Sequence, residues 1–344
     1  MDFSFSFQPP ETDMPVQISA KLLRELTPWP ALIEAVSTAF QSPCETPARS
    51  HYDVRVPGAE TASLLLMPAW TVGGVLGVKI VQVFPGNSQL GKPAISGIYM
   101  LASAVDGVVY ALIDAQELTA RRTAATSALA SRFLSRASSR RLLVLGTGKL
   151  SFNMVAAHAS VRSLGHVAIW GRNQEKALGV ASRVRTELDI DSDVVDDLPA
   201  AVRGADIIST VTTSTQAILP GRFLRPGTHV DLVGGFRPKM READDDVIRA
   251  ARVYVDTLQG AAVEAGDIAI PIARGIMQPS DICGDLSGLC QRRVLGRTSD
   301  SDITVFKSIG WALEDLAAAV LAWTSLQASR TGEFADTVDG IRIT

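Results

Sequence analysis

The stretch from Arg140 to Arg172 constrains the fold of this 344-residue chain more than any other part of the sequence. An apolar run at 142–145 breaks at Gly146-Thr147-Gly148, a helix-compatible segment follows, and a second apolar run covers 167–170. This order predicts a strand, a glycine turn, a helix and a strand. Such a turn directs backbone N–H groups and the positive end of the helix at one point, which suits a pyrophosphate. The stretch predicts a dinucleotide site, although Gly-x-Gly can also be a plain tight connection.

The later positions of this stretch say more about the cofactor. Ser151 stands where glycine or alanine lets helix and strand pack closely, and it is a small but imperfect substitute. The second strand ends in Gly171-Arg172-Asn173, where an NAD site has an acidic residue for the ribose hydroxyl. A cation with a short amide beside it suits a 2′-phosphate, so we predict NADPH. The alternative for Arg172 is an ordinary solvated arginine.

Length and composition set the class of the protein. The chain is long enough for two domains, and 47% hydrophobic with 20% charged residues is typical of a soluble globular protein. A net charge of −3 gives no basic surface of the kind that binds nucleic acid. No apolar run is long enough for a membrane span, and the N-terminus has no signal-peptide pattern. The three cysteines form no CxxC pair and the four histidines show no metal-ligand spacing. We expect a cytoplasmic protein without metal, nucleic-acid or membrane partners.

The flanking segments predict two different sheets. Residues 18–40 predict a helix interrupted at Pro28 and Pro30, and 43–55 a charged polar loop. Four apolar runs between residues 61 and 114 predict an antiparallel or mixed sheet, with a hairpin turn at Asp106-Gly107. Runs at 205–211, 229–235, 252–256 and 303–306 continue the alternation of strands and helices. The predicted class is α/β: a dinucleotide-binding domain at 126–307, and an α+β domain from both chain ends, 1–125 and 308–344.

Several polar residues are candidates for a site. Lys79 lies in an apolar strand, so its ammonium must snorkel, face solvent or enter a polar pocket. Arg121 and Arg122 follow a predicted helix cap at Asp114 and lie about 100° apart, so one can point into a cleft while the other is solvated. Hydroxyls at 212–215 follow one strand, where they suit a cofactor crevice, and two glycines at 234–235 allow close backbone approach.

Five blocks, in order, resemble the ornithine cyclodeaminase/μ-crystallin family. They are LTARRTAATSALA, LGTGKLS with VAIWGRNQEKA, ADIISTVTTSTQAIL, LRPGTHVDLVGGFRPKMREAD and ITVFKSIGWALEDLAAA. The resemblance covers about residues 49–319 and implies a homodimer whose subunits join a Rossmann domain to a substrate and dimerisation domain. It also implies that Arg49, Lys79 and Arg122 gather round the substrate carboxylate, and that Thr123 lies near the cofactor phosphates. The candidate cofactor contacts are Thr123, Gly146, Thr147, Gly148, Lys149, Leu150, Arg172, Asn173, Val211, Thr212, Thr213, Val233, Gly234 and Ser308.

One position bears on the activity. Ornithine cyclodeaminases carry aspartate directly after the double glycine, and this chain has Phe236, which can neither take a proton nor pair with an ammonium. Together with NADPH, this favours reduction of a cyclic imino acid: Δ1-pyrroline-2-carboxylate to L-proline, or Δ1-piperideine-2-carboxylate to L-pipecolate. Hydride would reach the C=N carbon while the three cations hold the carboxylate, and Lys79 or a water would supply the proton.

Other activities remain open from the sequence. On the same scaffold they are ornithine cyclodeamination, amino-acid dehydrogenation and an opine-type condensation. From a different class, a μ-crystallin-like protein would hold NADPH and a small ligand without turnover. A Rossmann domain with a decayed site is the remaining alternative.

Overall fold

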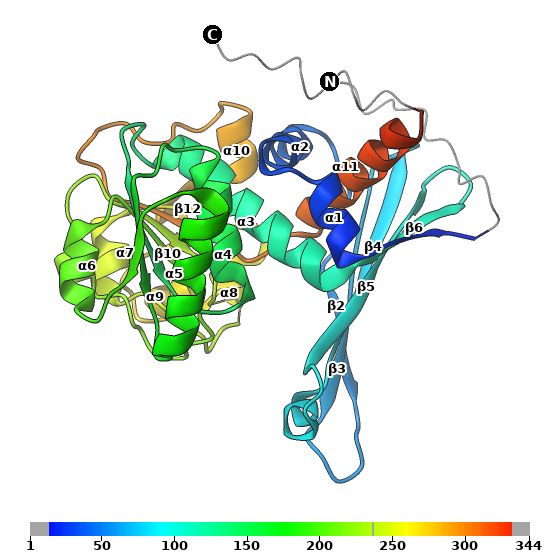
Figure 1. Cartoon of the computed structure of the whole chain (residues 1–344), viewed down its shortest axis with the longest axis horizontal. Helices are drawn as coiled ribbons and strands as arrows, with labels where there is room; N and C mark the ends of the chain where they lie inside the picture. The colour runs from blue at the N-terminus through cyan, green and yellow to red at the C-terminus, as the bar shows by residue number, and fades with distance from the viewer. Residues whose placement is uncertain (1–13, 236, 332–344) are drawn as a thin grey trace. The chain divides into compact units, whose positions relative to one another are not determined.

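The computed structural model describes residues 14–235 and 237–331, which form two compact units. The first unit runs up to Arg122 and resumes at Trp311, so its described elements are the blue-to-cyan and red ones in Figure 1. The second unit is Thr123–Gly310. The fold is α/β, as predicted from the sequence, with one parallel sheet and one largely antiparallel sheet.

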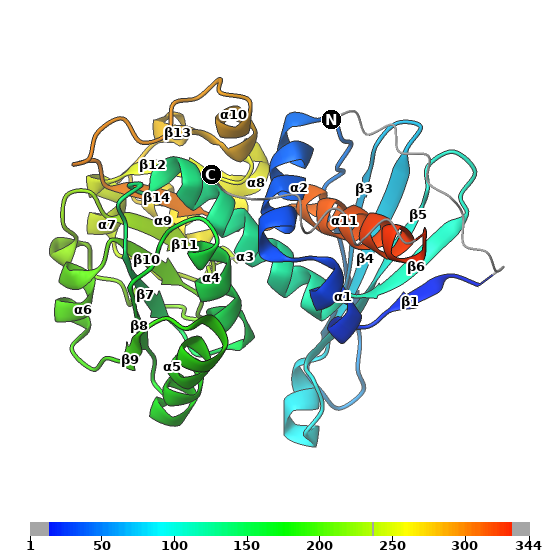
Figure 2. The same cartoon turned by 45° about the horizontal axis from the view of Figure 1, so that its top comes forward.

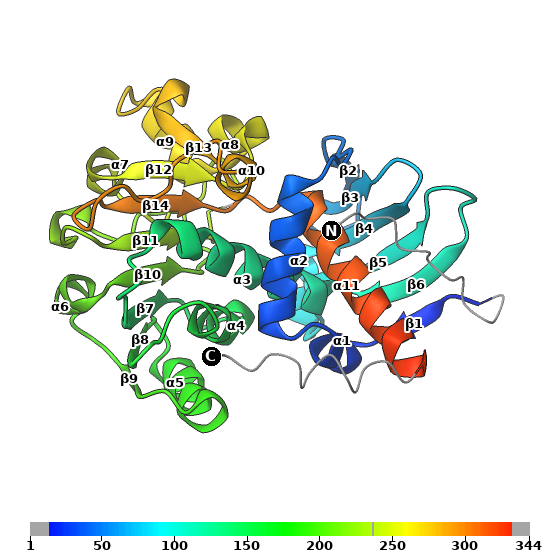
Figure 3. The ribbon, with the colours of Figure 1, turned by 90° about the horizontal axis from the view of Figure 1, so that it is seen from above.

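The second unit is built on a parallel sheet with the strand order β13-β12-β14-β11-β10-β7-β8-β9 (Figure 3). Its strands are β7 Arg141–Leu145, β8 His166–Trp170, β9 Ser192–Val194, β10 Ile207–Thr210, β11 His229–Leu232, β12 Arg252–Val255, β13 Ile282–Asp285 and β14 Thr304–Lys307. From β7 the chain moves to β8 and β9 on one side, then returns to build β10 and β11 on the other. The order therefore reverses beside β7, and ligands of open α/β sheets bind at the strand ends of such a point.

Both faces of this sheet are buried. Leu143 and Leu145 face one apolar core and Leu142 and Val144 face the other. Strands that are buried on both faces have continuous apolar runs instead of alternating ones. The strands predicted from such runs are confirmed. The helices are α4 Lys149–Ala159, α5 Gln174–Leu188, α6 Leu198–Gly204, α7 Asp245–Ala250, α8 Leu258–Glu264, α9 Gly266–Ala273 and α10 Leu286–Cys290, with 3-10 turns η2 Gly221–Phe223 and η3 Pro279–Asp281.

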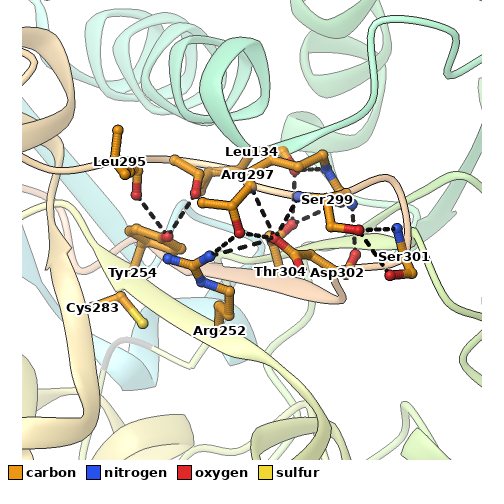
Figure 4. Close-up of polar contacts among 12 residues, drawn as sticks. Leu134, Arg252, Tyr254, Cys283, Leu295, Arg297, Ser299, Ser301, Asp302 and Thr304 are labelled. Atoms are coloured by element: carbon orange, nitrogen blue, oxygen red, sulfur yellow. Dashed lines mark hydrogen bonds and ion pairs between the residues drawn. The ribbon is translucent and has the colours of Figure 1, made fainter.

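A polar network fixes the segment that leads into β14 (Figure 4). The Tyr254 hydroxyl donates to the carbonyls of Leu295 and Gly296 at 2.9 and 3.0 Å. The Asp302 carboxylate accepts the N–H groups of residues 298 and 299 at 2.9 and 3.1 Å. These bonds hold the amino end of β14, so the strand enters the sheet in a fixed register and presents residues 307 and 308 at its carboxyl end.

The first unit carries a sheet in the order β1-β6-β5-β4-β3-β2, antiparallel except for the parallel pair of β1 and β6. Its strands are β1 Val16–Ile18, β2 Ser50–Val54, β3 Ala62–Trp70, β4 Val75–Val83, β5 Ile95–Ser103 and β6 Val109–Asp114. The predicted hairpin turn is confirmed, with Gly107 at φ +77° between β5 and β6. Helix α11, Ala312–Thr331, packs against β3, β4 and β5 (Figure 2).

Proline and capping residues set the helix boundaries of the first unit. Helices α1, Ala20–Leu26, and α2, Trp29–Gln41, are separate, because Pro28 and Pro30 fit a helix start but not a helix interior. Helix α3, Ala115–Leu134, begins at the predicted cap, where Asp114 Oδ1 accepts the N–H of Glu117 at 2.8 Å. A 3-10 helix, η1 Pro85–Leu90, follows β4. The predicted polar loop at 43–55 was partly wrong: it contains β2, whose polar sequence reflects its position at the sheet edge.

Candidate functional site

A buried group of two cations and two carboxylates joins β4, α3 and α11 in the first unit. The Lys79 ammonium lies 2.7 Å from Asp315 Oδ2. Arg122 places Nε 3.1 Å from Asp315 Oδ1 and Nη1 2.5 Å from Glu314 Oε2. None of the four side chains is more than 6% exposed. Asp315 therefore holds together two cations that come from different elements of the fold.

Arg49 directly precedes β2, which begins at Ser50, and it is partly buried. Lys79 lies on β4, two strands away in the sheet, where it pairs with Met67 of β3. The predicted gathering of Arg49 with Lys79 and Arg122 therefore stays a prediction.

Burial changes the chemistry of Lys79. It lowers the pKa of the ammonium from the usual 10.5 to about 8, against the opposing effect of the Asp315 carboxylate, and the Arg122 cation adds to the lowering. A lysine with this pKa can release and regain a proton near neutral pH. Of the settings that the sequence allowed for Lys79, the structure selects a buried polar one.

Arg121 is also buried, so the expectation that one of the two arginines is solvated was wrong. Its Nε donates to Thr27 Oγ1 at 2.7 Å, and its guanidinium lies 4.2 Å above the Trp29 ring. The two arginines point about 100° apart around α3, as expected, but both side chains are buried. Arg121 fixes α3 against the start of α2, which is a structural task.

The glycine turn of the second unit lies at the point where the strand order reverses. Gly146 follows β7 with φ +131°, and a Cβ there would lie 2.8 Å from the Val211 carbonyl oxygen. Val211 in turn donates its N–H to Leu145 at 2.8 Å. Only glycine fits this approach, and it brings two predicted cofactor contacts, Gly146 and Val211, side by side.

Ser151 has a role that its small size alone did not explain. It is fully buried, and its hydroxyl donates to the Gly146 carbonyl at 2.9 Å. Gly148 is the N-cap of α4, with open space where a Cβ would lie. Thr147 packs against Gly171, where a Cβ would lie 2.4 Å from the Thr147 methyl. The Ser151 hydrogen bond and the Thr147 contact therefore fix the turn, while the space next to Gly148 stays open. Lys149 and Leu150 begin the helix that follows the turn.

The end of β8 presents an exposed cation beside this turn. Gly146 donates its N–H to Trp170 at 2.9 Å, which ties the turn to the last residue of β8. Arg172 follows two residues later and is exposed. Asn173 is the N-cap of α5, because its Oδ1 accepts the Lys176 N–H at 2.8 Å. Its amide oxygen is therefore used by the helix.

A buried carboxylate holds the next two strand ends. Glu242 Oε1 accepts the N–H and the hydroxyl of Thr212 at 2.6 and 2.7 Å. Its Oε2 accepts the Gly234 N–H at 2.6 Å and the Thr210 hydroxyl at 2.7 Å. The end of β10 and the double glycine after β11 are thus fixed by one side chain. Ser308 joins them, since its N–H bonds to Leu232 at 3.0 Å.

The remaining predicted residues lie as follows. Thr213 is exposed in the loop after β10, Val233 is buried directly after β11, and Thr123 is buried on α3. Phe236 lies outside the described residues. Within those that are described, no three His, Cys, Asp or Glu side chains gather as a metal site would need, and no helix has the length and hydropathy to cross a membrane.

Sequence reasoning missed the acidic partners. Glu314 and Asp315 bind the two cations, and Glu242 holds the strand ends, yet none of them was a candidate. A weak signal existed for the first pair, because Glu314 and Asp315 are the only acids of α11, although acids are common in the first turn of a helix. Glu242 lies in a polar segment and had no such signal.

The fold and these features define a class before any comparison: an α/β chain in which a Rossmann-type unit accompanies a second unit with a buried lysine–arginine–carboxylate group. A family model described as the ornithine cyclodeaminase/mu-crystallin family matches residues 15–330. The chain belongs to this family.

Individual relatives cover most of the chain. Protein SAR DEFICIENT 4 of Arabidopsis thaliana is 38% identical and covers 90% of this chain and 96% of its own length. Delta(1)-pyrroline-2-carboxylate reductase of Paracoccus denitrificans is 36% identical, over 76% of this chain and 83% of its own. A solved structure of the reductase of that name from Thermococcus litoralis, in complex with NADH and L-proline, is 28% identical with a TM-score of 0.85, covering 92% and 98% of the two chains.

Proposed function

We propose that the protein reduces a cyclic imino acid with a nicotinamide dinucleotide, Δ1-pyrroline-2-carboxylate to L-proline being the first substrate to test. The observation that carries the proposal is the buried group in which Asp315 orients both Lys79 and Arg122. The similarity to reductases of this substrate in Paracoccus denitrificans and Thermococcus litoralis supports it.

The charges of the first unit suit a substrate with one carboxylate. Glu314 and Asp315 balance the charges of Lys79 and Arg122, so Arg49, as the proposed third cation, would leave the group with a net charge of +1. The acids fix the direction of the two buried cations, so less conformational freedom is lost when a carboxylate binds. A carboxylate held by an arginine and a lysine has a defined orientation, as attack on its neighbouring carbon requires.

The second unit fits a dinucleotide. The open space over Gly148 and the N-terminus of α4, which Gly148 starts without a side-chain cap, suit a pyrophosphate. The collision that any Cβ at Gly146 would meet explains the glycine there. When bound, the reduced nicotinamide supplies a hydride. The chain's own part is to hold the carboxylate through Arg49, Lys79 and Arg122, and to give a proton to the imine nitrogen from Lys79, directly or through a water.

The direct test is a substrate panel with purified protein. We expect NADPH oxidation, followed at 340 nm, with pyrroline-2-carboxylate or piperideine-2-carboxylate, and formation of the L-amino acid. Ornithine with catalytic NAD, and 2-oxo acids with ammonia, are the controls for the alternative activities on this scaffold. Tight dinucleotide binding without turnover of either imine would contradict a reductase and favour a binding protein.

We also propose NADPH as the preferred donor, because Arg172 presents an exposed cation where a 2′-phosphate would lie. Replacing Arg172 by alanine should lower the preference for NADPH over NADH by about tenfold or more, the value of one charge-assisted phosphate contact. The ratio of the two kcat/KM values measures this. Arg183→Ala is the control, since this exposed arginine of α5 pairs with Glu187 and lies far along the helix. An unchanged ratio in Arg172→Ala would make Arg172 an ordinary surface residue.

A homodimer is the proposed assembly. The face of the first unit's sheet opposite α11 carries a group of apolar side chains that are only partly buried. They are Leu64, Leu66, Leu76, Val78, Ile80, Ile98 and Met100. A contiguous apolar face of this kind is characteristic of a protein–protein interface, and a second copy of the same sheet would cover it symmetrically.

A further inference from the structure

Several buried carboxylates lie near the carboxyl ends of the parallel strands, with one buried lysine among them. Glu242, Asp256 and Asp267 are each 0% exposed. Glu242 lies in the segment after β11, Asp256 directly follows β12, and Asp267 lies in the first turn of α9. Lys307 is the buried cation among them, with Nζ 3.6 Å from Asp267 Oδ2 and 3.0 Å from the Leu232 carbonyl. Of the three carboxylates, Asp267 is the one within ion-pair distance of this ammonium, and Lys307 also acts on the charge of Glu242. Asp256 instead accepts the N–H groups of residues 257, 309 and 310.

The donors around Glu242 favour its ionised form. Burial, the largest effect, raises the pKa of Glu242 above its usual value and Asp267 adds to this, while Lys307 and the hydrogen bonds oppose the rise. Two of its four donors are the N–H groups of Thr212 and Gly234, which cannot accept a proton in return, and both oxygens already receive two bonds. A carboxylate whose lone pairs all face donors is stabilised in its charged form.

The double glycine brings the backbone directly against these acids. A Cβ on Gly234 would lie 2.5 Å from Glu242 Oε1, and one on Gly235 would lie 2.2 Å from Asp267 Oδ2. Asp267 uses its other oxygen for the N–H groups of Glu242 and Ala243, at 2.8 and 3.0 Å. Within the described residues, Asp267 Oδ2 is buried and accepts no hydrogen bond. Its charge is therefore only partly neutralised, just behind the glycines.

We propose that Glu242 and Asp267 favour the oxidised form of the bound cofactor by placing buried negative charge at the ends of β10 and β11. The proposed 2′-phosphate contact, Arg172, follows β8 on the other side of β7, so the nicotinamide would lie towards β10 and β11. The inference rests on the proposed dinucleotide site. Giving up a hydride removes an electron pair from the neutral reduced ring and leaves it with one positive charge, while the imine carbon gains the hydride and its nitrogen a proton. Negative charge in a low-dielectric surrounding stabilises the ring that becomes positive, and thereby favours hydride donation. Glu242 is a positioning residue that also sets this electrostatic preference.

The experiment compares the affinities of the oxidised and reduced cofactors in equilibrium titrations, which require no turnover. Wild-type protein should bind NADP+ at least as tightly as NADPH. Glu242→Gln, which keeps the shape and removes the charge, should shift the affinity ratio towards the reduced form by about tenfold, or about 1.4 kcal/mol. Asp267→Asn should shift it in the same direction and carries the test if Glu242→Gln does not fold.

The matched control is Thr210→Val, which removes one hydrogen bond to Glu242 and leaves every charge in place. It should weaken both forms of the cofactor by the same factor. An equal loss for both forms in Glu242→Gln and Asp267→Asn, or a wild-type protein that clearly prefers NADPH over NADP+, would overturn the inference. Failure of the wild-type protein to bind any dinucleotide would instead reject the proposed cofactor site.

Discussion

Asp315→Asn should cost this protein about 3–5 kcal/mol of its free energy of unfolding, because two buried cations lose a shared counter-charge. The carboxylate lies 2.7 Å from the Lys79 ammonium and 3.1 Å from Arg122 Nε, and it is fully buried. Asp315 also opposes the effect of burial on Lys79, whose pKa is about 8. Without it the pKa of Lys79 should fall further. Chemical denaturation measures the stability, and the pH dependence of kcat/KM measures the titration.

The sign of the pH effect follows from the role of Lys79 as a proton donor. Activity should fall as pH rises through about 8 in the wild-type protein, because the ammonium is lost. In Asp315→Asn this alkaline limb should move to lower pH by about one unit. Glu314→Gln is the control: Glu314 pairs with Arg122, so its loss should raise KM and leave the limb nearly in place. An alkaline limb that does not move in Asp315→Asn would show that another group, or water, supplies the proton.

Gly234→Ala should be among the most damaging single substitutions in the second unit. Its Cβ would lie 2.0 Å from the Thr212 carbonyl oxygen and 2.5 Å from Glu242 Oε1, so backbone and carboxylate would both have to move. Overpacking of this severity costs about 3 kcal/mol or more. The shift would also separate the two strand ends that Glu242 holds, so dinucleotide affinity should fall together with the free energy of unfolding.

Gly148→Ala is the counterpart that separates stability from binding. Gly148 has φ −83° and open space where a Cβ would lie, so its substitution should change stability by no more than about 1 kcal/mol. The new methyl group would nevertheless occupy the space proposed for the pyrophosphate. We expect a folded protein with weak dinucleotide binding, measured by thermal denaturation and equilibrium titration. A stable Gly234→Ala, or full dinucleotide affinity in Gly148→Ala, would contradict this account of the two glycines.

Much of the fold could be predicted because its central strands have two buried faces. The apolar runs at 142–145 and 167–170 became β7 and β8, and proline and aspartate marked helix starts correctly at Pro28 and Asp114. Edge elements were missed. β2 is polar because one side of an edge strand faces water, and β9 has only three residues. In α8 the chain departs from helical geometry at Gly260, with φ +87°, so no regular period was visible.

The candidate site could be predicted only in part, for a different physical reason. Lys79 was conspicuous as a charge in an apolar strand, and the family resemblance selected Arg122 over Arg121. Their carboxylate partners lie on α11, near the far end of the chain, and the choice of partner depends on how that helix packs on the sheet. Similarly, the four donors to Glu242 come from one strand, β10, and from the loops after β10 and β11. Spacing along the sequence does not encode contacts of this kind.

Arg172 and Asn173 are neighbours in the chain but have separate roles, one proposed for cofactor binding and one in starting a helix. Asn173 starts helix α5 through its side chain, whereas the exposed neighbour Arg172 is the proposed reader of the phosphate. The two tasks fall on adjacent but separate residues, so a substitution at position 172 leaves the cap of α5 in place. On the proposed role of Arg172, a chain with this scaffold would change its donor preference at that position without a loss of stability.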